Sequence, residues 1–189
     1  MTTTQSYFFA NREPIDLAAI ELMGVSVKSG DSPIGYFGTG LKFALATLAR
    51  HGQKVTLRLG NRMISFQAFP ETVRGQTFER VFMLEAGEAK GLGFTTQLGR
   101  NWQLWQAFRE LESNCRDEQG VSRPRTGDGD WPADWGTVFE VTGEAFASVA
   151  AQKDKYFLAS DARFADYSIE VHPLGPDPKA VYYRGELAG

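Results

Sequence analysis

Residues 34–44 read IGYFGTGLKFA, a glycine-rich turn that runs directly into a helix, and the fold is deduced from this stretch. Glycines allow tight turns and bring backbone amides close to a ligand. The first turn of a helix adds N–H groups without helical partners and the positive end of the helix dipole, so the stretch predicts a phosphate site. Lys42 would add a positive charge to that site. A turn that merely introduces an amphipathic helix is the alternative, because short glycine patterns are weakly specific.

Two better-known phosphate motifs do not fit this stretch. The glycine at Gly35 is not followed at the required spacing by the Gly-Lys-Ser/Thr of a P-loop. A dinucleotide-binding fingerprint requires a strand that leads into the glycines, and no clear strand precedes residue 34.

A second informative stretch is RELESNCRDE at residues 109–118. On a helix, with about 100° between residues, apolar side chains spaced four, three and four form one stripe that should face the core. Polar side chains spaced four and three form a second stripe beside it. A carboxylate there can accept a proton from water, and an amide oxygen can bind magnesium. A solvated polar flank of the helix is the alternative. The core stripe is Leu104, Phe108, Leu111 and Cys115; the polar stripe is Glu110, Asn114 and Asp117; Arg109, Glu112 and Arg116 are expected to be solvated.

The rest of the chain predicts an α/β protein with a mostly antiparallel sheet. Apolar periodicity of the helical kind marks one set of segments and alternation marks another. These elements favour a two-layer sandwich with the helices on one face of the sheet, formed by a single domain over residues 1–189. Helices are expected at 14–23, 41–50, 102–118 (capped by Asn101) and 145–157, strands at 54–60, 63–69, 78–86, 93–99, 137–142, 167–172 and 180–185, and loops at 24–40 and 119–135.

Composition narrows the class of protein. A chain of 189 residues with 42% hydrophobic residues can bury a core without disulfides, and its one cysteine, Cys115, cannot form an internal one. The net charge of −3 disfavours a dedicated nucleic-acid binder, which needs a basic surface. We find no apolar run of the ~20 residues that a membrane span needs, and residues 1–7 do not resemble a secretory signal. The expectation is a cytoplasmic protein with no nucleic-acid or membrane partner.

Together, the two stretches resemble motifs of the GHKL ATPases, which include gyrase-type topoisomerases, ninety-kilodalton heat-shock chaperones, histidine kinases and mismatch-repair ATPases. IGYFGTGLKFA is similar to the second glycine box, and the preceding GVSVKSGDSP (24–33) looks like the ATP-lid entry of the chaperone branch. RELESNCRDE resembles the N-box, in which Glu, three residues, Asn, two residues and Asp follow one another. The regions that carry the motifs are 14–50 and 102–118, about a third of the chain.

The resemblance implies a role for each matching residue. Glu110 matches the general base for the attacking water, Asn114 the Mg²⁺ ligand and Asp117 a polar residue of the nucleotide pocket. Thr137, which opens a predicted strand, resembles a family threonine near adenine. The phosphate-cradling turn would comprise Gly35, Gly38 and Gly40, the amides around Phe37 and Thr39, and the following Lys42.

The chain departs from the family pattern in two ways. The family usually places the N-box before the glycine box, whereas here the glycine box comes first, which implies a circularly permuted Bergerat-like fold. The Asp-x-Gly-x-Gly box that reads adenine is not found; TGDGD (126–130) and VTGE (141–144) match it poorly.

The expected function is therefore Mg²⁺-dependent ATP binding with slow ATP hydrolysis. The alternative is a non-hydrolysing switch or inhibitor module that binds ATP or ADP and acts on a protein partner. Phosphotransfer would need an outside acceptor, because His51 and His172 lie outside any helix of the phosphoacceptor kind. A purely structural protein is the remaining possibility.

Overall fold

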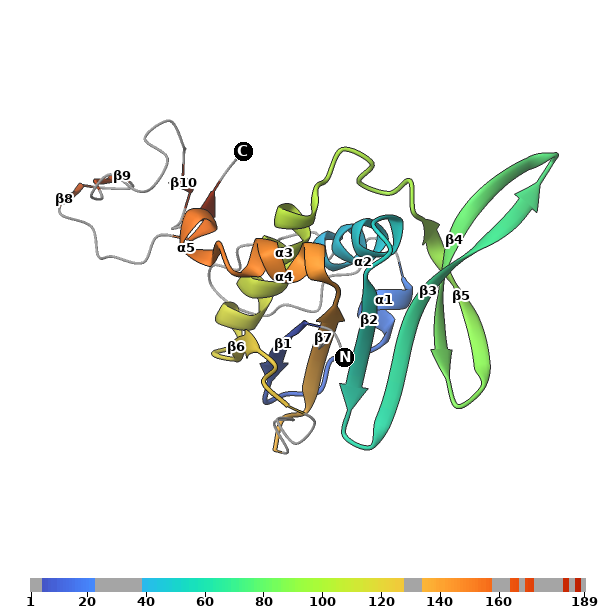
Figure 1. Ribbon diagram of the computed structural model, residues 1–189, viewed down its shortest axis with the longest axis horizontal. Coiled ribbons are helices and arrows are strands. Elements are labelled where there is room, and N and C mark those ends of the chain that lie inside the picture. Colours follow the sequence, from blue (N-terminus) through green and yellow to red (C-terminus); the bar gives the residue numbers. More distant parts are fainter. Residues whose placement is uncertain are drawn as a thin grey trace.

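The computed structural model describes residues 5–22, 39–127 and 134–157, four short strands between residues 164 and 187, and the side chain of Glu186. The described residues form an α/β fold around a seven-stranded antiparallel sheet, with strand order β5-β4-β3-β2-β7-β1-β6 (Figure 1). The seven strands are β1 (Ser6–Asn11), β2 (Lys54–Leu59), β3 (Arg62–Val73), β4 (Gln76–Glu85), β5 (Glu88–Thr95), β6 (Val121–Pro124) and β7 (Thr137–Thr142). Two small hairpins pair β8 (Phe164–Asp166) with β9 (Ile169–Val171), and β10 (Tyr182–Tyr183) with β11 (Glu186–Leu187).

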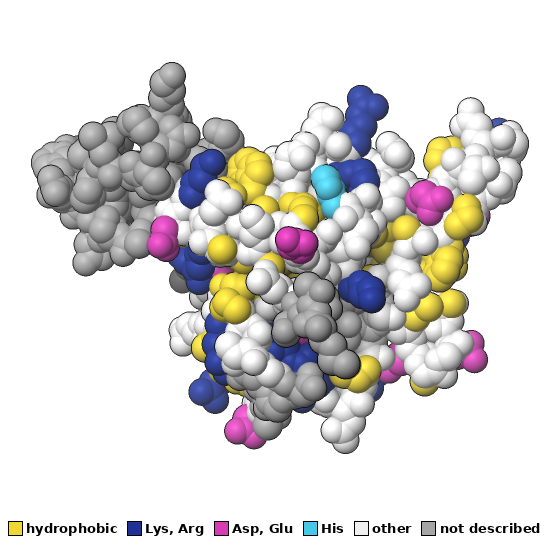
Figure 2. Space-filling model, in the orientation of Figure 1, with side chains coloured by type: hydrophobic (Ala, Val, Ile, Leu, Met, Phe, Trp, Pro, Cys, Tyr) yellow, Lys and Arg dark blue, Asp and Glu magenta, His cyan; other side chains and the backbone are white. Residues whose placement is uncertain are grey.

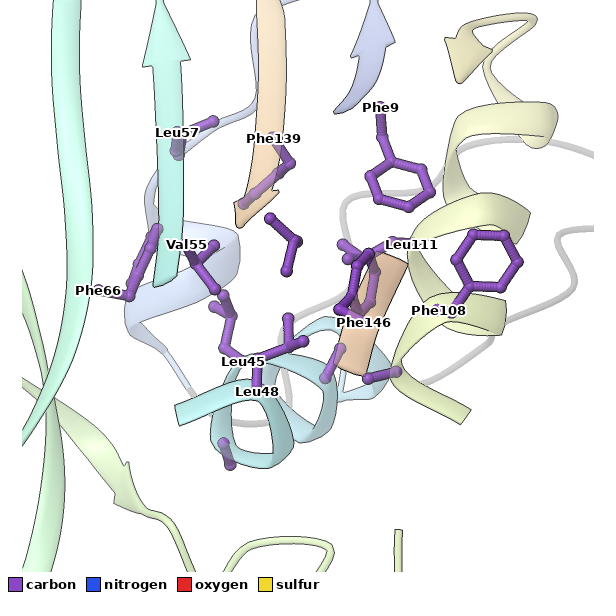
Figure 3. Close-up of a cluster of buried hydrophobic side chains, with 14 of the residues drawn as sticks. Phe9, Leu45, Leu48, Val55, Leu57, Phe66, Phe108, Leu111, Phe139 and Phe146 are labelled. Atoms are coloured by element: carbon purple, nitrogen blue, oxygen red, sulfur yellow. The ribbon is translucent and has the colours of Figure 1, made fainter. Parts of the chain in front are cut away.

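The main helices pack against one face of the sheet, where they bury the core (Figure 3). The helices are α1 (Ala18–Glu21), α2 (Gly40–Arg50), α3 (Leu104–Asp117), α4 (Glu144–Ala150) and α5 (Lys153–Tyr156). The strands contribute Phe9, Val55, Leu57, Phe66 and Phe139 to this core, and the helices contribute Leu45, Leu48, Phe108, Leu111 and Phe146. None of the helices in the described part of the chain is long and apolar enough to cross a bilayer.

Local sequence patterns predicted the position of most helices and strands. The alternation in KVTLRL puts Val55 and Leu57 on the buried face of β2, and Gly60, at φ +56°, makes the turn into β3. The predicted helix at 41–50 and the predicted strand at 137–142 coincide with α2 and β7, the former to within one residue. The α/β class with an antiparallel sheet is thus confirmed.

The strand β1 has no counterpart among the predicted elements. Its sequence, SYFFAN, does not alternate, because the strand lies between β7 and β6 and is buried on both faces. Tyr7 and Phe9 face the helices, while Phe8 and Ala10 form a small cluster with Val138 on the other face.

Four further expectations need correction. The predicted loop at 119–135 contains β6, whose residues pair with β1 far back in the sequence. The predicted helix at 14–23 is reduced to α1, because the backbone N–H of Ile15 is held by the Thr137 hydroxyl at 2.7 Å. The predicted helix at 145–157 is two helices, divided where Gln152 turns its side chain back to the Ser148 carbonyl. Asn101 does not cap α3; the helix starts after Gln103, whose N–H donates to Gln106 Oε1 at 2.6 Å.

Arg50, at the end of α2, fixes the segment that leads into α3. Its guanidinium donates to the carbonyl oxygens of Thr96 at 2.6 Å and Trp102 at 2.8 Å. It also reaches the Leu98 and Gly99 carbonyls at 3.4 and 3.2 Å. A planar guanidinium can serve several acceptors at once, so Arg50 ties the segment before α3 to the last turn of α2.

Candidate functional site

The start of α2 lies against the polar stripe of α3. A Cβ atom added to Gly40 would overlap the carboxylate of Glu110, at a separation that real Cβ atoms do not adopt. Only glycine lets the carboxylate approach this closely. Two stretches that were singled out separately, about 70 residues apart in the sequence, thus meet at one point in the fold. Gly40 is the first residue of α2, and Thr39 is the N-cap residue before it.

Within α3, Glu110 and Asn114 are directly joined. The Asn114 Nδ2 donates a hydrogen bond to Glu110 Oε1 at 3.0 Å, and both side chains are half-buried. Because the amide nitrogen is used in this bond, the amide oxygen of Asn114 is the atom left for a cation. Asp117, one turn further along the same stripe, is exposed. The α3 stripe therefore presents a carboxylate, an amide and a second carboxylate beside the start of α2.

Lys42 is turned towards α1. Its side chain is fully buried, and its Nζ donates to the Ala19 carbonyl at 2.6 Å. Burial lowers the pKa of its ammonium group below the usual value. The structure thus gives Lys42 a contact that joins α2 to α1, whereas its role at the phosphate turn stays a prediction.

Thr137 has a structural use at the start of β7. Its hydroxyl donates to the Glu13 carbonyl and accepts from the Ile15 N–H, both at 2.7 Å. These two bonds hold the segment before α1 against the sheet. Gly35, Phe37 and Gly38, the other residues expected at the phosphate turn, lie outside the described residues.

Glu112 was expected to be solvated, and this expectation is wrong. The residue is only 1% exposed. Its Oε1 accepts from Lys153 at 2.6 Å and from Arg116 at 2.8 Å, and its Oε2 accepts from the Ser122 hydroxyl at 2.5 Å. Burial by itself would raise the pKa of this carboxyl, but the hydrogen bonds from Lys153, Ser122 and Arg116 together hold it below the usual value.

The Glu112 network connects α3 to α5 and β6, so it holds the helix that carries the polar stripe. The spacing of apolar residues on α3 predicted exposure wrongly, because Glu112 lies at the edge of the core stripe. At such a position, contacts with other segments determine whether the side chain is exposed or buried. Those partners come from segments distant in sequence, and no local sequence pattern indicates them. Cys115, in contrast, is buried as expected, and burial raises the pKa of its thiol to about 12.

Glu186 is a further residue of the site that the sequence did not single out. It comes from the C-terminal strand β11, whose backbone forms a bridge with Phe157. Burial raises the pKa of the Glu186 carboxyl above the usual value, and the negative charges of Asp117 and Glu110 on α3 act in the same direction. Nothing in the local sequence around residue 186 indicates this environment, because it depends on where the last strand meets α3.

A separate surface feature lies at the projecting end of the sheet. The β3–β4 hairpin extends beyond the helices, and hydrophobic side chains gather along this end (Figures 1 and 2). A hollow of about 260 Å³ opens there beside the Arg80–Glu71 ion pair, and Val73, Phe78 and Phe94 line it. None of the predicted site residues within the described ranges lines this hollow.

Comparison with known proteins gives no relative from which a role could be transferred. No family model, curated protein or solved structure matches the chain. Among the described residues, no three His, Cys, Asp or Glu side chains converge on a possible metal position.

Proposed function

We propose that this chain binds ATP with Mg²⁺ between the start of α2 and the polar stripe of α3, as a circularly permuted relative of the GHKL ATPases. The observation that supports this best is the close contact of Gly40 with Glu110. The glycine stretch resembles a phosphate cradle and the α3 stripe resembles an N-box, and in the resembled family both belong to one site. A chance resemblance of two unrelated segments would not require them to touch.

In this proposal the phosphates lie at the N-terminus of α2. A helix start offers N–H groups and a positive dipole end to an anion, whatever the net charge of the protein. Gly40 supplies the close backbone approach, with Thr39 beside it. The turn formed by Gly35, Phe37 and Gly38 would complete the cradle, and Thr137 would lie near the base.

Asn114 and the phosphates would share the Mg²⁺ ion. Magnesium takes oxygen ligands and is usually bound by one or two protein groups together with substrate phosphates and water. Asn114 suits this kind of coordination, because its amide oxygen is not used in the hydrogen bond to Glu110. When bound, the ion would neutralise phosphate charge.

Glu110 would act as the general base of slow hydrolysis. It would take the proton of a water molecule as the water oxygen attacks the γ-phosphorus, so that ADP leaves and inorganic phosphate forms. The hydrogen bond from Asn114 would hold the carboxylate in position through its Oε1.

A non-hydrolysing switch, active in the cytoplasm on a protein partner, is the second candidate. The observation that favours it is that the Glu110 carboxylate lies directly on the start of α2, where it satisfies the positive helix end itself. A nucleotide would then displace this carboxylate, and α3 would respond to binding. The missing adenine-reading Asp-x-Gly-x-Gly box also favours binding without efficient turnover.

Titration of the purified chain with ATP, ADP and GTP, with and without Mg²⁺, tests the proposal. We expect ATP to bind, with higher affinity in the presence of Mg²⁺. Asn114→Ala should weaken binding in Mg²⁺ more than metal-free binding, because it removes a metal ligand and leaves the cradle. Failure of every nucleotide to bind would reject both candidate functions.

The variant Glu110→Ala separates the two candidates. A general base contributes about 10²–10⁴-fold to the rate, so this variant should abolish detectable ATP hydrolysis while the affinity for ATP stays within a few-fold. Glu79→Ala, at an exposed position of β4, is the matched control and should retain turnover. Tight binding without turnover in the unmodified protein would support the switch.

A further inference from the structure

The strands β3 and β4 continue beyond their neighbours as a two-stranded arm. β2 pairs with β3 only as far as Phe66, and β5 pairs with β4 only from Arg80 onwards. The arm therefore consists of residues 67–73 and 76–79, which pair with each other and project past the helices (Figure 1). A ribbon of two strands without a core of its own is marginally stable in water, so a partner that covers it would stabilise it.

The arm has one apolar face, opposite to the face of β4 that packs on the helices. Neighbouring residues of a strand face opposite sides, and Val81 is buried in the core. Phe78 therefore lies on the outer face, as does its cross-strand partner Glu71. Phe69 and Val73 share this face, and these two side chains and Phe78 are 39%, 52% and 37% exposed. The other face of the arm carries Pro70, Thr72, Thr77 and Glu79.

The hollow of about 260 Å³ lies at the root of the apolar face. It forms where one residue of β4, between Arg80 and Phe82, lies opposite three residues of β5. The Arg80 guanidinium crosses this bulge, and it donates to the carbonyl oxygens of Leu92 at 2.8 Å and Gly91 at 3.3 Å. The hollow is smaller than the ~300–1,000 Å³ of most small-molecule sites, and it suits a single large side chain of a partner.

The apolar face offers a carboxylate to a partner at the edge of the hollow. Arg80 directs Nη1 to both oxygens of Glu71, at 2.9 and 3.2 Å, and its other donors to backbone carbonyl groups. The Glu71 side chain is 39% exposed. A carboxylate has about four acceptor positions, so Glu71 can accept a further bond from a cation that approaches from solvent. A partner with a basic residue beside its apolar one complements this face.

The dimensions of the arm determine what can cover it. Two strands about 4.8 Å apart are roughly 10 Å wide, and residues 67–73, at about 3.3 Å each, span roughly 23 Å. A stable complex buries about 800 Å² on each partner, so the arm alone is too small to hold two copies of this chain together. One α-helix of about 15 residues matches both dimensions. Proline in an edge strand opposes the addition of a further strand, so Pro70 favours a helix over an extended segment.

We propose that the apolar face of the arm binds an amphipathic helix of another protein. One large apolar side chain of that helix occupies the hollow beside Phe78, and a lysine or arginine one turn away pairs with Glu71. Such a helix would present its apolar residues at positions i, i+3 or i+4, and i+7. The arm lies outside the proposed nucleotide site, so this interaction and ATP binding can be tested independently.

The test selects peptides of about 15 residues from a phage-displayed library of helical sequences on the immobilised full-length chain. The dissociation constant of the best peptide is then measured by fluorescence anisotropy. We expect the selected peptides to share the helical apolar spacing and a basic residue. Phe78→Ser should weaken binding roughly 30-fold. Glu71→Gln should weaken it about three- to tenfold, and this effect should shrink as the salt concentration rises.

Matched controls change the same residue types elsewhere on the sheet. Glu79→Gln removes a charge from the other face of the arm, and Val121→Ser removes an exposed apolar side chain from β6. Neither should change the dissociation constant. Melting curves show that each variant is folded, and Val73→Ser, at a position 52% exposed, is a second apolar variant that should weaken binding several-fold.

Four results would overturn the proposal: no peptide selected, selected peptides that lack the basic residue, selected peptides without helical spacing, or equal binding by the arm variants and the controls. Sedimentation of the unmodified protein gives a further check. A dimer that Phe78→Ser dissociates would mean that a second copy covers the arm, and the helix would be rejected. None of these results depends on whether ATP binds, so the proposed function is tested separately.

Discussion

The contact between Gly40 and Glu110 can be tested without any ligand by the substitution Gly40→Ala. Gly40 is the first residue of α2 and adopts a helical backbone, so an alanine there meets no backbone strain. Its Cβ would nevertheless overlap the Glu110 carboxylate, closer than the 3.0 Å that real Cβ atoms keep from other heavy atoms. The carboxylate is the far end of a flexible side chain, so it can move aside. Movement would break its 3.0 Å hydrogen bond with Asn114.

Two opposing effects determine the change in the free energy of unfolding. Alanine in place of glycine favours a helix by about 0.5–1 kcal/mol. Displacement of the carboxylate by about 1 Å to reach van der Waals distance, with loss of the Asn114 hydrogen bond, costs about 1–2 kcal/mol. Gly40→Ala alone should therefore be neutral or destabilising by about 1 kcal/mol. In a Glu110→Ala background, the same substitution should stabilise the protein by about 0.5–1 kcal/mol, because the obstacle is gone.

Urea unfolding of the four proteins of this double-mutant cycle, followed by circular dichroism, gives the coupling energy between the two positions. We expect about 1–2 kcal/mol. A coupling energy within about 0.3 kcal/mol of zero would show that the two residues do not touch, and the argument for a shared site would lose its main support. In the proposed ATPase, a misplacement of this size should also lower turnover about 100-fold.

Substitutions at three further positions test the contacts that hold the site. Glu112→Ala should lower the free energy of unfolding by about 3–4 kcal/mol in urea, because it leaves Lys153 and its partners without their buried anion, whereas Glu79→Ala should change it by less than about 0.5 kcal/mol. The pKa of Glu112 is lowered in the folded state, so its contribution is present above pH 4.5 and is lost as the pH falls through the folded pKa; acid unfolding of Glu112→Gln should lack this component, and a pH titration of stability would show it. Arg50→Lys should lower the melting temperature and increase hydrogen exchange over residues 96–103, because an ammonium cannot serve the same set of carbonyl groups. Thr137→Val should cost about 1–2 kcal/mol through two lost hydrogen bonds, and Thr137→Ser should restore most of it; equal stability of the two variants would contradict the structural use of the hydroxyl.

The sequence predicted those parts of the fold that depend on local patterns. The strands β2, β3 and β4 follow from alternation and turn glycines, and α2 and α3 follow from apolar stripes at helical spacing. The strand expected at 93–99 is displaced, because β5 runs over Glu88–Thr95 and residues 96–99 form turns. Phe108, Leu111 and Cys115 are buried as the stripe in α3 indicates. Such features need only neighbouring residues, and for that reason one sequence suffices to find them.

What the sequence could not supply depends on contacts between distant segments. Phe8 and Phe9 are adjacent in β1 and so face opposite sides of the sheet, as in any strand, and both are buried because β1 is covered on both faces. The sequence around Glu112 does not distinguish it from a surface glutamate, because its partners Lys153 and Ser122 come from distant segments. In the candidate site, the residue types of the α3 stripe were found from their spacing, but Glu186 joins them through the path of the last strand.

The position of β1 determines when the domain can fold during synthesis. The strands that pair with β1 are residues 121–124 and 137–142. Phe9 therefore cannot pair with Phe139 until about 130 further residues have been translated. Within the β2–β5 meander each strand pairs with the next one in the sequence, so the meander can form early, but the sheet is complete only when β7 has been translated and pairs with β2 and β1. Until then the run Tyr7-Phe8-Phe9 lacks β7 as a partner and is an apolar segment without its final strand pairing. This run is therefore where a chaperone would bind the emerging polypeptide, and a truncated translation product that ends before residue 137 would expose it permanently.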